Sequence, residues 1–474
     1  MSELIAAIAT PPGPGGVGIL RLSGPGAAQA AAHIFQPLGK TPLSEAPDRQ
    51  LLYGRVFDQA GDLLDTGLAF VSRAPHSYTG EETAEIQCHG SPVVLSLALD
   101  ALCAAGARLA RPGEFTQRAF LNGKLDLTQA EAVIDLIDAE TPAAARQAAG
   151  QLNGALSRQI DSIYSALTDL MAHFCAVLDY PDEDIDPFQA EQMGQILARQ
   201  EAALQALLAT SRRGTLLHQG ITCVLIGRPN AGKSSLLNAL AGYERAIVTN
   251  IPGTTRDTVE TKVTLGGYLF RLVDTAGLRD SDDPIEQLGV ARSRQALAEA
   301  DLVLAVCDGT QPLTEEDHDL LRQALAQADT ILLANKRDLP DFTLPQPAAN
   351  DALNTLTVVP LSAKTGDGLD TLETTLAQRA ETLLPQAAQS AAGELLTNQR
   401  QTQAAQRALD GVTRAKDALD LGMTPDALLT DVEAALEALG ELTGRTVRED
   451  ITARIFSRFC VGKGGETAKW CSLV

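Results

Sequence analysis

Hydrophobic and polar positions follow two patterns in the first half of the chain. Residues 1–121 combine short β-type runs, such as GVGILRLSG and LLYGRVF, with amphipathic runs such as SPVVLSLALDALCAAGA, among many Gly and Pro residues. This mixture predicts an α+β domain. Residues 122–216 are rich in Ala, Leu and Gln at helical spacing, interrupted by the acidic loop DYPDEDIDP. They predict an α-helical domain.

A third pattern begins at residue 217. From 217 to 384 the apolar runs ITCVLIG, YLFRLVDT, DLVLAVCDG, TILLANK and TVVPLSA alternate with helical segments, which predicts a parallel sheet covered by helices. The run ETKVTLGGYLFRLVDT adds a hairpin with a Gly-Gly turn. Residues 385–463 return to the helical composition, and residues 464–474 form a C-terminal extension. We therefore expect a multidomain protein in which an α/β domain is inserted into one helical domain.

Charge and cysteine content restrict the class of protein. The net charge of -22 argues against a protein that coats nucleic acid or anionic membranes, because such binding depends on Lys and Arg. Any RNA contact must then be local or supplied by a partner. The seven cysteines are an odd number without a CxxC pair, which fits a reducing compartment. With no apolar run of about 18 residues, we expect a soluble, cytoplasmic protein.

The stretch GRPNAGKSS carries the first candidate chemistry. It follows the strand-like run ITCVLIG and opens a helical run, so Gly227, Gly232, Lys233 and Ser234 match a phosphate-binding loop in its required context. The glycines let backbone N–H groups face phosphates, Lys233 would neutralise the β- and γ-phosphates, and Ser234 would ligate Mg²⁺. The alternative is a chance glycine loop.

Later elements in the same order strengthen the nucleotide hypothesis. Asp274, at the end of RLVDTAG, suits the acidic residue near a magnesium ion, Gly277 offers an N–H to the γ-phosphate, and the hydroxyl of Thr255 could complete the metal shell. In NKRD, Asp338 could accept from the two N–H groups of guanine while Asn335 reaches the other side of the base. Adenine has no such donor pair, so the sequence predicts GTP.

The candidate GTP contacts come from the phosphate loop, the switch segments, NKRD and the LSAKTG loop: Asn230, Ala231, Gly232, Lys233, Ser234, Ser235, Thr249, Asn250, Ile251, Pro252, Gly253, Thr254, Thr255, Asp274, Thr275, Ala276, Gly277, Asn335, Lys336, Asp338, Ser362, Ala363 and Lys364. The rival interpretation is an ordinary α/β fold with incidental loops.

The chain resembles the tRNA modification GTPase family MnmE, also called TrmE, from near its N-terminus to Lys463. The motifs that carry this resemblance lie outside the nucleotide loops: TPPGPGGVGILRLSG, SYTGEETAEIQCHGS, RPGEFTQRAFLNGKLDLTQAEAVIDLIDA, LDYPDEDID and ARIFSRFCVGK, the last similar to the family's terminal GRIFSxFCIGK. The resemblance implies a Ras-like P-loop GTPase domain inserted in the helical domain. The chain departs from the family pattern in one respect, because it continues past Lys463 with GGETAKWCSLV.

The resemblance also implies a tetrahydrofolate-binding-like N-terminal domain that forms a homodimer and uses 5-formyl- or methylene-tetrahydrofolate. Matching motif positions make Arg21, Glu85, Lys124 and Lys463 the folate contacts. The alternative for each is a solvated surface charge. A carboxylate could accept from the pterin N–H edge, and Arg or Lys could bind the glutamyl tail.

The implied reaction places a carboxymethylaminomethyl or aminomethyl group on C5 of the wobble uridine of certain tRNAs. The implied partner is the flavoprotein MnmG (GidA), which supplies FAD and much of the RNA-binding surface in a heterotetramer or larger complex. Cys460, in the terminal C-x-G-K, is a candidate nucleophile or else a small packing residue. Two rival functions are a regulatory GTPase acting by binding, for example in ribosome assembly, and a folate enzyme with a vestigial GTPase domain.

The switch segment DTAGLRDSDDPIEQLGV has Leu278 where Ras-like GTPases have a glutamine that orients water. The resemblance implies that Glu286 replaces it, with Asp282 and Asp283 as nearby alternatives. It also implies that K⁺, rather than an arginine finger, offsets charge at the phosphates. The implied K⁺ ligands are Asn230, Thr249, Ile251 and Thr254. Arg256 is the alternative charge-stabilising group.

Overall fold

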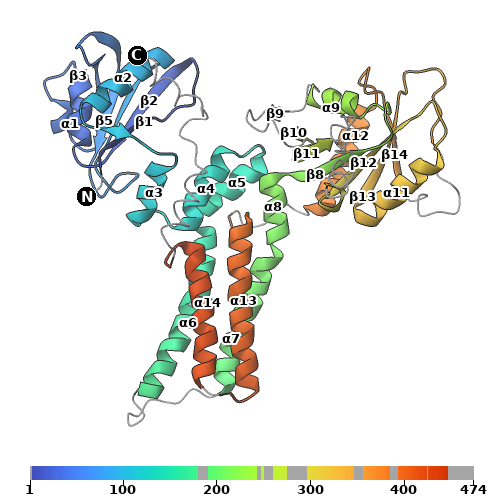
Figure 1. The fold of residues 1–474 in the computed structure, drawn as a ribbon. Coiled ribbons are helices and arrows are strands. Elements are labelled where there is room, and N and C mark those ends of the chain that lie inside the picture. The colour runs from blue at the N-terminus through green and yellow to red at the C-terminus, as the bar shows by residue number, and fades with distance from the viewer. Residues whose placement is uncertain are drawn as a thin grey trace, which may run out of the picture. The chain divides into compact units, whose positions relative to one another are not determined.

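The computed structural model describes most of the chain as two compact units (Figure 1). Residues 3–134, 160–168 and 433–446 belong to the first unit, and residues 135–159 and the described parts of 169–432 belong to the second. The described residues are 3–179, 190–242, 247–249, 260–274, 296–345, 356–384, 393–423 and 425–446.

The first unit contains a sheet in the order β3-β4-β5-β6-β2-β1-β7. Its strands are β1 (Ile5–Ile8), β2 (Gly15–Ser23), β3 (Phe35–Pro37), β4 (Leu52–Phe57), β5 (Leu63–Ser72), β6 (Thr83–Gly90) and β7 (Arg108–Leu109). The β1–β7 pair is parallel and the other pairs are antiparallel. Helices α1 (Ala27–Ile34), α2 (Pro92–Ala104), α3 (Glu114–Leu121) and α4 (Leu127–Ile137) and the 3-10 turn η1 (Leu43–Glu45) accompany it.

The two faces of this sheet differ in polarity. Leu20, Leu22 and Ile86 are buried in one core with side chains of α1 and α2. Because side chains alternate along a strand, Arg21 and Glu85 lie on the opposite face. This alternation places polar groups on a surface that α1 and α2 leave free.

The second unit contains a sheet in the order β14-β13-β12-β8-β11-β10-β9. Its strands are β8 (Ile221–Ile226), β9 (Ile247–Thr249), β10 (Glu260–Leu265), β11 (Tyr268–Asp274), β12 (Leu302–Asp308), β13 (Asp329–Asn335) and β14 (Thr357–Pro360). Neighbouring strands from β14 to β11 in this order are parallel. β10 pairs antiparallel with both β11 and β9. The predicted α/β sheet is therefore confirmed.

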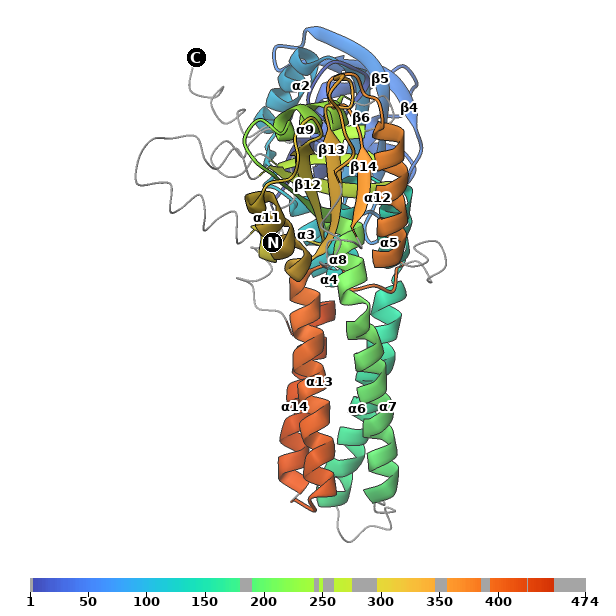
Figure 2. The same cartoon turned by 90° about the vertical axis from the view of Figure 1, so that its right-hand side faces the viewer.

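Helices cover both faces of the second sheet. Side chains of α9 (Lys233–Ala241) and α12 (Leu369–Leu383) join one core, and those of α11 (Glu315–Gln327) join the other. Figure 2 shows α11 and α12 on opposite sides of β12, β13 and β14. The predicted hairpin is also present, since Leu265 pairs with Tyr268 and both turn glycines have positive φ, 57° and 84°.

The helical stretches before and after this sheet pack together, as their composition predicts. The helices are α5 (Pro142–Leu152), α6 (Ala155–Asp179), α7 (Ala190–Ala209), α8 (Ser211–Gln219), α13 (Gln399–Asp420) and α14 (Pro425–Thr443). Glu201 on α7 accepts from Lys416 of α13 at 2.6 Å, and Gln147 of α5 accepts from the Gly393 N–H at 2.8 Å. Within the described residues, no helix is both long enough and apolar enough to span a bilayer.

Candidate functional site

The loop between β8 and α9 has the form of a phosphate-binding loop. It runs from Gly227 to Gly232, and α9 begins at Lys233. All of β8 is buried, while α9 buries Leu236 and Leu240. The loop is therefore fixed at both ends, by a strand and by a helix that are packed into the core. The first N–H groups of α9, with the positive end of its dipole, suit an anion.

Two glycines in this loop allow close approach of neighbouring strands. Gly227 has φ 141°, and a Cβ there would lie 2.1 Å from the carbonyl oxygen of Val306. Gly232 has φ 101°, and a Cβ there would lie 2.1 Å from Nδ2 of Asn335. Both positions need glycine because other residues disfavour this backbone region and would clash.

The ammonium and hydroxyl groups at the start of α9 lie close to the loop backbone and to β11. Lys233 is buried, and its Nζ donates to the carbonyl oxygens of Gly227 at 2.7 Å and Arg228 at 2.9 Å. Ser234 Oγ donates to Oδ2 of Asp274, the last residue of β11, at 3.2 Å. A hydroxyl oxygen beside a carboxylate is a donor set that suits Mg²⁺.

The predicted base-reading loops meet the phosphate loop through Asn335. This residue ends β13 and is 3% exposed. Its Nδ2 donates to the Ala231 carbonyl at 2.9 Å, and its Oδ1 accepts from the Ala363 N–H at 3.0 Å. Ser362 Oγ donates to Asp338 Oδ1 at 2.7 Å. Three loops that are distant in sequence therefore lie together at the carboxyl ends of parallel strands, where α/β folds bind ligands.

Asp308 is a site residue that the motifs did not reveal. It ends β12 and accepts a 2.6 Å hydrogen bond from Nζ of Lys336, which has φ 68°. Burial by itself would raise the pKa of Asp308, but hydrogen bonds from Lys336 and Thr310 outweigh it and hold the pKa below its ordinary value. Its place at the end of DLVLAVCDG, at the same sheet edge as NKRD, is the signal that could have identified it.

The remaining described candidates differ in exposure: Ala231 is buried, and the others named here are exposed. Asn230 has φ 63° and borders a pocket of about 330 Å³ beside the phosphate loop. Ala231 lines the same pocket, whereas Ser235 and Lys364 are exposed. Among the described residues, no group of three or more His, Cys, Asp and Glu side chains could hold a metal ion.

In the first unit, the structure brings together two of the four predicted folate contacts. Arg21 Nε donates to Glu85 Oε1 at 2.7 Å across the β2–β6 pair. The Arg21 guanidinium carbon lies 5.8 Å from the ring centre of Tyr78 and 5.9 Å from that of Phe115. Lys124 does not join this pair; its Nζ donates to the Pro75 carbonyl at 3.1 Å, in the loop that leads to Tyr78.

A buried ion network anchors α3 beside this pair. Glu114 is 2% exposed and accepts from Arg108 at 2.6 Å and from Arg118 at 3.0 Å. Arg118 also donates to Glu81 at 2.8 Å. Burial would raise the pKa of Glu114, but Arg108, the Arg111 N–H and Arg118 lower it to about 2. The network ties the loop around Tyr78 to α3.

The buried thiols of the described residues are poor nucleophiles. Burial raises the pKa of Cys88 to about 11 and that of Cys307 to about 12, and it raises the pKa of Cys223 further. A thiol with so high a pKa remains protonated near neutral pH. These three cysteines are therefore packing residues.

Other predicted site residues lie outside the described part of the chain. Thr249 is the last residue of β9, and its side chain is not described. Outside it altogether lie Asn250, Ile251, Pro252, Gly253, Thr254, Thr255, Thr275, Ala276, Gly277, Glu286, Cys460 and Lys463.

Comparison with known proteins covers nearly the whole chain. Residues 4–124 match the family described as "GTP-binding protein TrmE N-terminus", and residues 127–460 match the "MnmE helical domain". Among solved structures, the G domain of the T. maritima FeoB iron transporter is 29% identical, with a TM-score of 0.25, over 34% of this chain and 98% of that one.

Two curated relatives are similar over their full lengths. The "tRNA modification GTPase MnmE" of Symbiobacterium thermophilum is 46% identical over 97% of this chain and 99% of that protein. The protein of the same name from Chloroflexus aurantiacus is 46% identical over 98% of this chain and 100% of that protein. Because the similarity extends through the N-terminal, helical and nucleotide-binding segments alike, the chain belongs to the MnmE (TrmE) family of tRNA modification GTPases.

Proposed function

We propose that this chain binds and hydrolyses GTP while it modifies C5 of the wobble uridine in certain tRNAs, with a tetrahydrofolate one-carbon donor and a flavoprotein partner. The observation that carries the proposal is the contact of the phosphate loop with the NKRD and SAK loops through Asn335, in a chain of this family. The added group is a carboxymethylaminomethyl or aminomethyl group.

The nucleotide contacts follow from the chemistry of each group. The N–H groups at the start of α9 and the Lys233 ammonium bind the phosphates. Asp338 accepts from the guanine N–H groups, and its hydrogen bond from Ser362 fixes the carboxylate. Ser234, with Thr255, would hold Mg²⁺, and Asp274 would orient its shell. Bound Mg²⁺ would neutralise phosphate charge.

We assign the positioning of the attacking water to Glu286, because Leu278 has no polar group for that task. Replacement of Glu286 by Ala should leave GTP and GDP affinity nearly unchanged and lower turnover by about 10² to 10⁴-fold. Single-turnover hydrolysis and nucleotide titration measure the two quantities. Unchanged turnover would transfer the role to Asp282 or Asp283.

The folate proposal is supported by the first unit. The Arg21 guanidinium of the Arg21–Glu85 pair lies near the rings of Tyr78 and Phe115, on which a pterin could stack while Glu85 accepts from its N–H edge. Lys124 and Lys463 are the proposed contacts to the remainder of the folate, and Cys460 the proposed nucleophile. We propose residues 1–121 as the folate-binding and homodimerising domain, 122–216 with 385–463 as the helical domain, and 217–384 as the GTPase domain.

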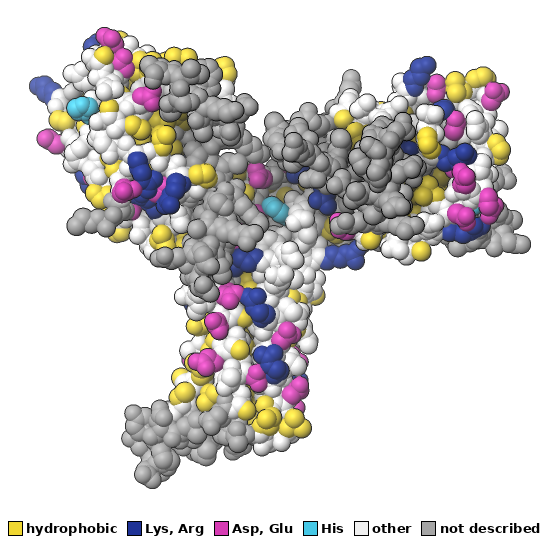
Figure 3. Space-filling view, viewed as in Figure 1, with side chains coloured by type: hydrophobic (Ala, Val, Ile, Leu, Met, Phe, Trp, Pro, Cys, Tyr) yellow, Lys and Arg dark blue, Asp and Glu magenta, His cyan; other side chains and the backbone are white. Residues whose placement is uncertain are grey.

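The surface charge supports a partner in RNA binding. Over the described residues of the face drawn in Figure 3, Lys and Arg side chains are interspersed with Asp and Glu. With a net charge of -22, such a surface gives little non-specific RNA affinity. The FAD-bearing protein MnmG is proposed to supply that surface, and the complex is proposed to work in the cytoplasm.

The deciding experiment is nucleoside analysis of tRNA from a strain that lacks this gene, with and without the wild-type copy. We expect the modified wobble uridine to disappear and to return on complementation, but not with the Lys233→Ala variant. A modified nucleoside that persists undiminished in the deletion strain would leave the regulatory GTPase as the better function.

A further inference from the structure

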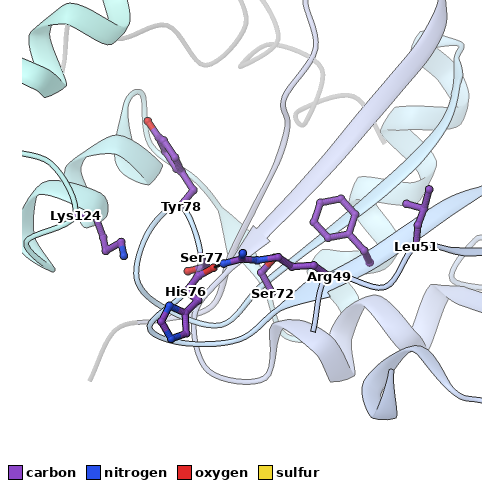
Figure 4. Close-up of a pocket in the computed structure, with 8 residues that line it drawn as sticks. Arg49, Leu51, Ser72, His76, Ser77, Tyr78 and Lys124 are labelled. Atoms are coloured by element: carbon purple, nitrogen blue, oxygen red, sulfur yellow. Dashed lines mark hydrogen bonds between the residues drawn. The ribbon is translucent and has the colours of Figure 1, made fainter. Parts of the chain in front are cut away.

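A pocket lies near the Arg21–Glu85 pair. The pocket, of about 620 Å³, is lined by residues from the segment just before β4, the end of β5, the loop before β6 and the segment after α3. Its lining includes Arg49, Leu51, Phe70, His76, Tyr78 and Lys124 (Figure 4). Among the described residues that line it, no side chain is acidic.

This pocket continues the surface that carries Arg21 and Glu85. Phe70 pairs with Glu85 across β5 and β6, so the two side chains lie on the same face of the sheet. Tyr78 connects the pocket with the Arg21–Glu85 pair. Its ring centre lies 5.8 Å from the Arg21 guanidinium carbon, and Tyr78 also lines the pocket. A ligand seated at Glu85 could therefore extend into the pocket past two aromatic rings.

Two cationic side chains line the pocket and donate hydrogen bonds to successive backbone carbonyls. Arg49 Nη2 donates to the carbonyl of His76, and Lys124 Nζ donates to that of Pro75 at 3.1 Å. Figure 4 shows Arg49 and Lys124 on either side of the His76 loop. Within the described residues, Lys124 has no carboxylate within 4.0 Å, and the carboxylate nearest to Arg49 is that of Asp48 at 3.7 Å. Lys124 can therefore bind an anion, and the long, exposed ion pair with Asp48 leaves Arg49 able to bind one as well.

The backbone holds Arg49 in an unusual conformation. Its φ of 59° lies in the left-handed region, which residues other than glycine seldom adopt. The Arg49 N–H donates to Val71 at 2.8 Å, and Asp48 accepts from the Arg73 N–H at 2.7 Å, so β5 fixes this turn. Such conformations persist where the surroundings impose them, and they cluster at ligand sites.

We propose that this pocket binds the anionic glutamate tail of the folate donor, so that the protein favours polyglutamylated folates. The inference rests on the proposed folate donor. A pterin needs a carboxylate to accept from its N–H edge, and the pocket has none, whereas Arg49 and Lys124 suit carboxylates. Phe70 and Tyr78 suit the p-aminobenzoyl ring that joins pterin to tail.

The test is calorimetric titration of the full-length protein with 5-formyltetrahydrofolate that carries either one or five glutamates. At low salt, we expect the pentaglutamate to bind about tenfold more tightly, as a few partly exposed charge pairs would produce. Higher salt should reduce this preference, because it screens exposed charges. Arg49→Gln should lower the preference to about twofold, and Arg49→Lys should retain most of it.

The matched control is Arg55→Gln, which removes the same charge from an exposed position of β4 that does not line the pocket. It should leave the preference unchanged. Equal affinity of the wild type for both folates would overturn the tail site and leave the donor proposal intact. No binding of either folate would overturn both. A loss of tRNA affinity in Arg49→Gln, with the folate preference unchanged, would make the pocket an RNA contact instead.

Discussion

At the scale of single residues, the second unit positions its polar groups through a few long-range hydrogen bonds. Asn335 is buried and joins the phosphate loop to the SAK loop through Ala231 and Ala363. Asp338 is exposed, but the hydroxyl of Ser362 holds one of its carboxylate oxygens. The other oxygen can accept from a ligand, which makes Asp338 the natural position at which to change specificity.

Asp338→Asn should change the preferred nucleotide from guanosine to xanthosine phosphates. The amide can donate to the oxygen that xanthine has in place of the exocyclic amine of guanine. Titration with GDP and XDP measures the two affinities. Ser362→Ala, which removes only the supporting hydroxyl, should weaken GDP binding without creating affinity for XDP. A variant that retains its preference for GDP would show that NKRD does not read the base.

The lowered pKa of Glu114 predicts that the local stability of α3 depends on pH. Its folded pKa of about 2 lies below the ordinary 4.5, so its contribution to stability is complete above about pH 4.5 and disappears as pH falls towards 2. The difference between the two pKa values corresponds to a contribution of about 3 kcal/mol to the free energy of unfolding. Glu114→Gln should therefore destabilise α3 by about that amount at pH 7 and by much less near pH 2.

Native-state hydrogen exchange of the α3 amides, corrected for intrinsic rates, measures this difference at each pH. Glu3→Gln is the control, because Glu3 also binds Arg108 but is exposed; we expect it to change α3 stability little. A difference between wild type and Glu114→Gln that stays constant from pH 7 to pH 3 would contradict the assignment.

At the scale of elements, the β8–loop–α9 segment shows how a local motif depends on its neighbours. The strand and helix follow from hydrophobic periodicity, but the loop's glycines are required by β12 and β13, whose atoms approach them. The positions of the glycines are visible in the sequence. The close approaches of Val306 to Gly227 and of Asn335 to Gly232, which exclude larger residues, arise only when the sheet forms.

Gly232→Ala should weaken guanine nucleotide binding by more than tenfold. The added Cβ would displace the Asn335 amide, which would loosen the contact between the phosphate and base loops. Gly267→Ala is the matched control, because Gly267 also has positive φ, 84°, but no atom lies within 4 Å of the Cβ position. Fluorescent GDP titration compares the two variants, and equal losses of affinity would refute the role of this close approach.

At the scale of the whole molecule, the α/β sheet of the second unit begins and ends within one helical framework. Lys416 on α13 binds Glu201 on α7, and Lys262 on β10 binds Glu140 just before α5 at 2.9 Å. The helices on both sides of the sheet in sequence are therefore joined to each other and to the sheet.

The proposed K⁺ site predicts a cation-dependent rate. Hydrolysis should be faster in KCl than in matched NaCl, because the smaller Na⁺ would be held poorly by a site sized for K⁺, with Asn230, Thr249, Ile251 and Thr254 as its implied ligands. In the presence of GDP and aluminium fluoride, K⁺ should also promote pairing of two GTPase domains. Asn230→Ala should lose the difference between the salts. Equal wild-type rates in both salts would restore Arg256 as the charge-stabilising candidate.

The sequence by itself determined the features that depend on neighbouring residues. The alternation of apolar runs predicts the second sheet, and the Gly-Gly turn predicts the β10–β11 hairpin, because periodicity and backbone freedom act over a few residues. Gly227, Gly232, Lys233 and Ser234 are recognisable because a phosphate loop is one continuous segment.

Only the tertiary structure decided which distant groups meet. The Asp308–Lys336 ion pair, the bridge through Asn335 and the Arg49 pocket each join separate segments of the chain. Strand order and burial bring such groups together, and no local pattern encodes them. Lys124 illustrates the difference: the resemblance proposes it as a folate contact, whereas its place beside the Pro75 carbonyl depends on how the loop before β6 packs against α3.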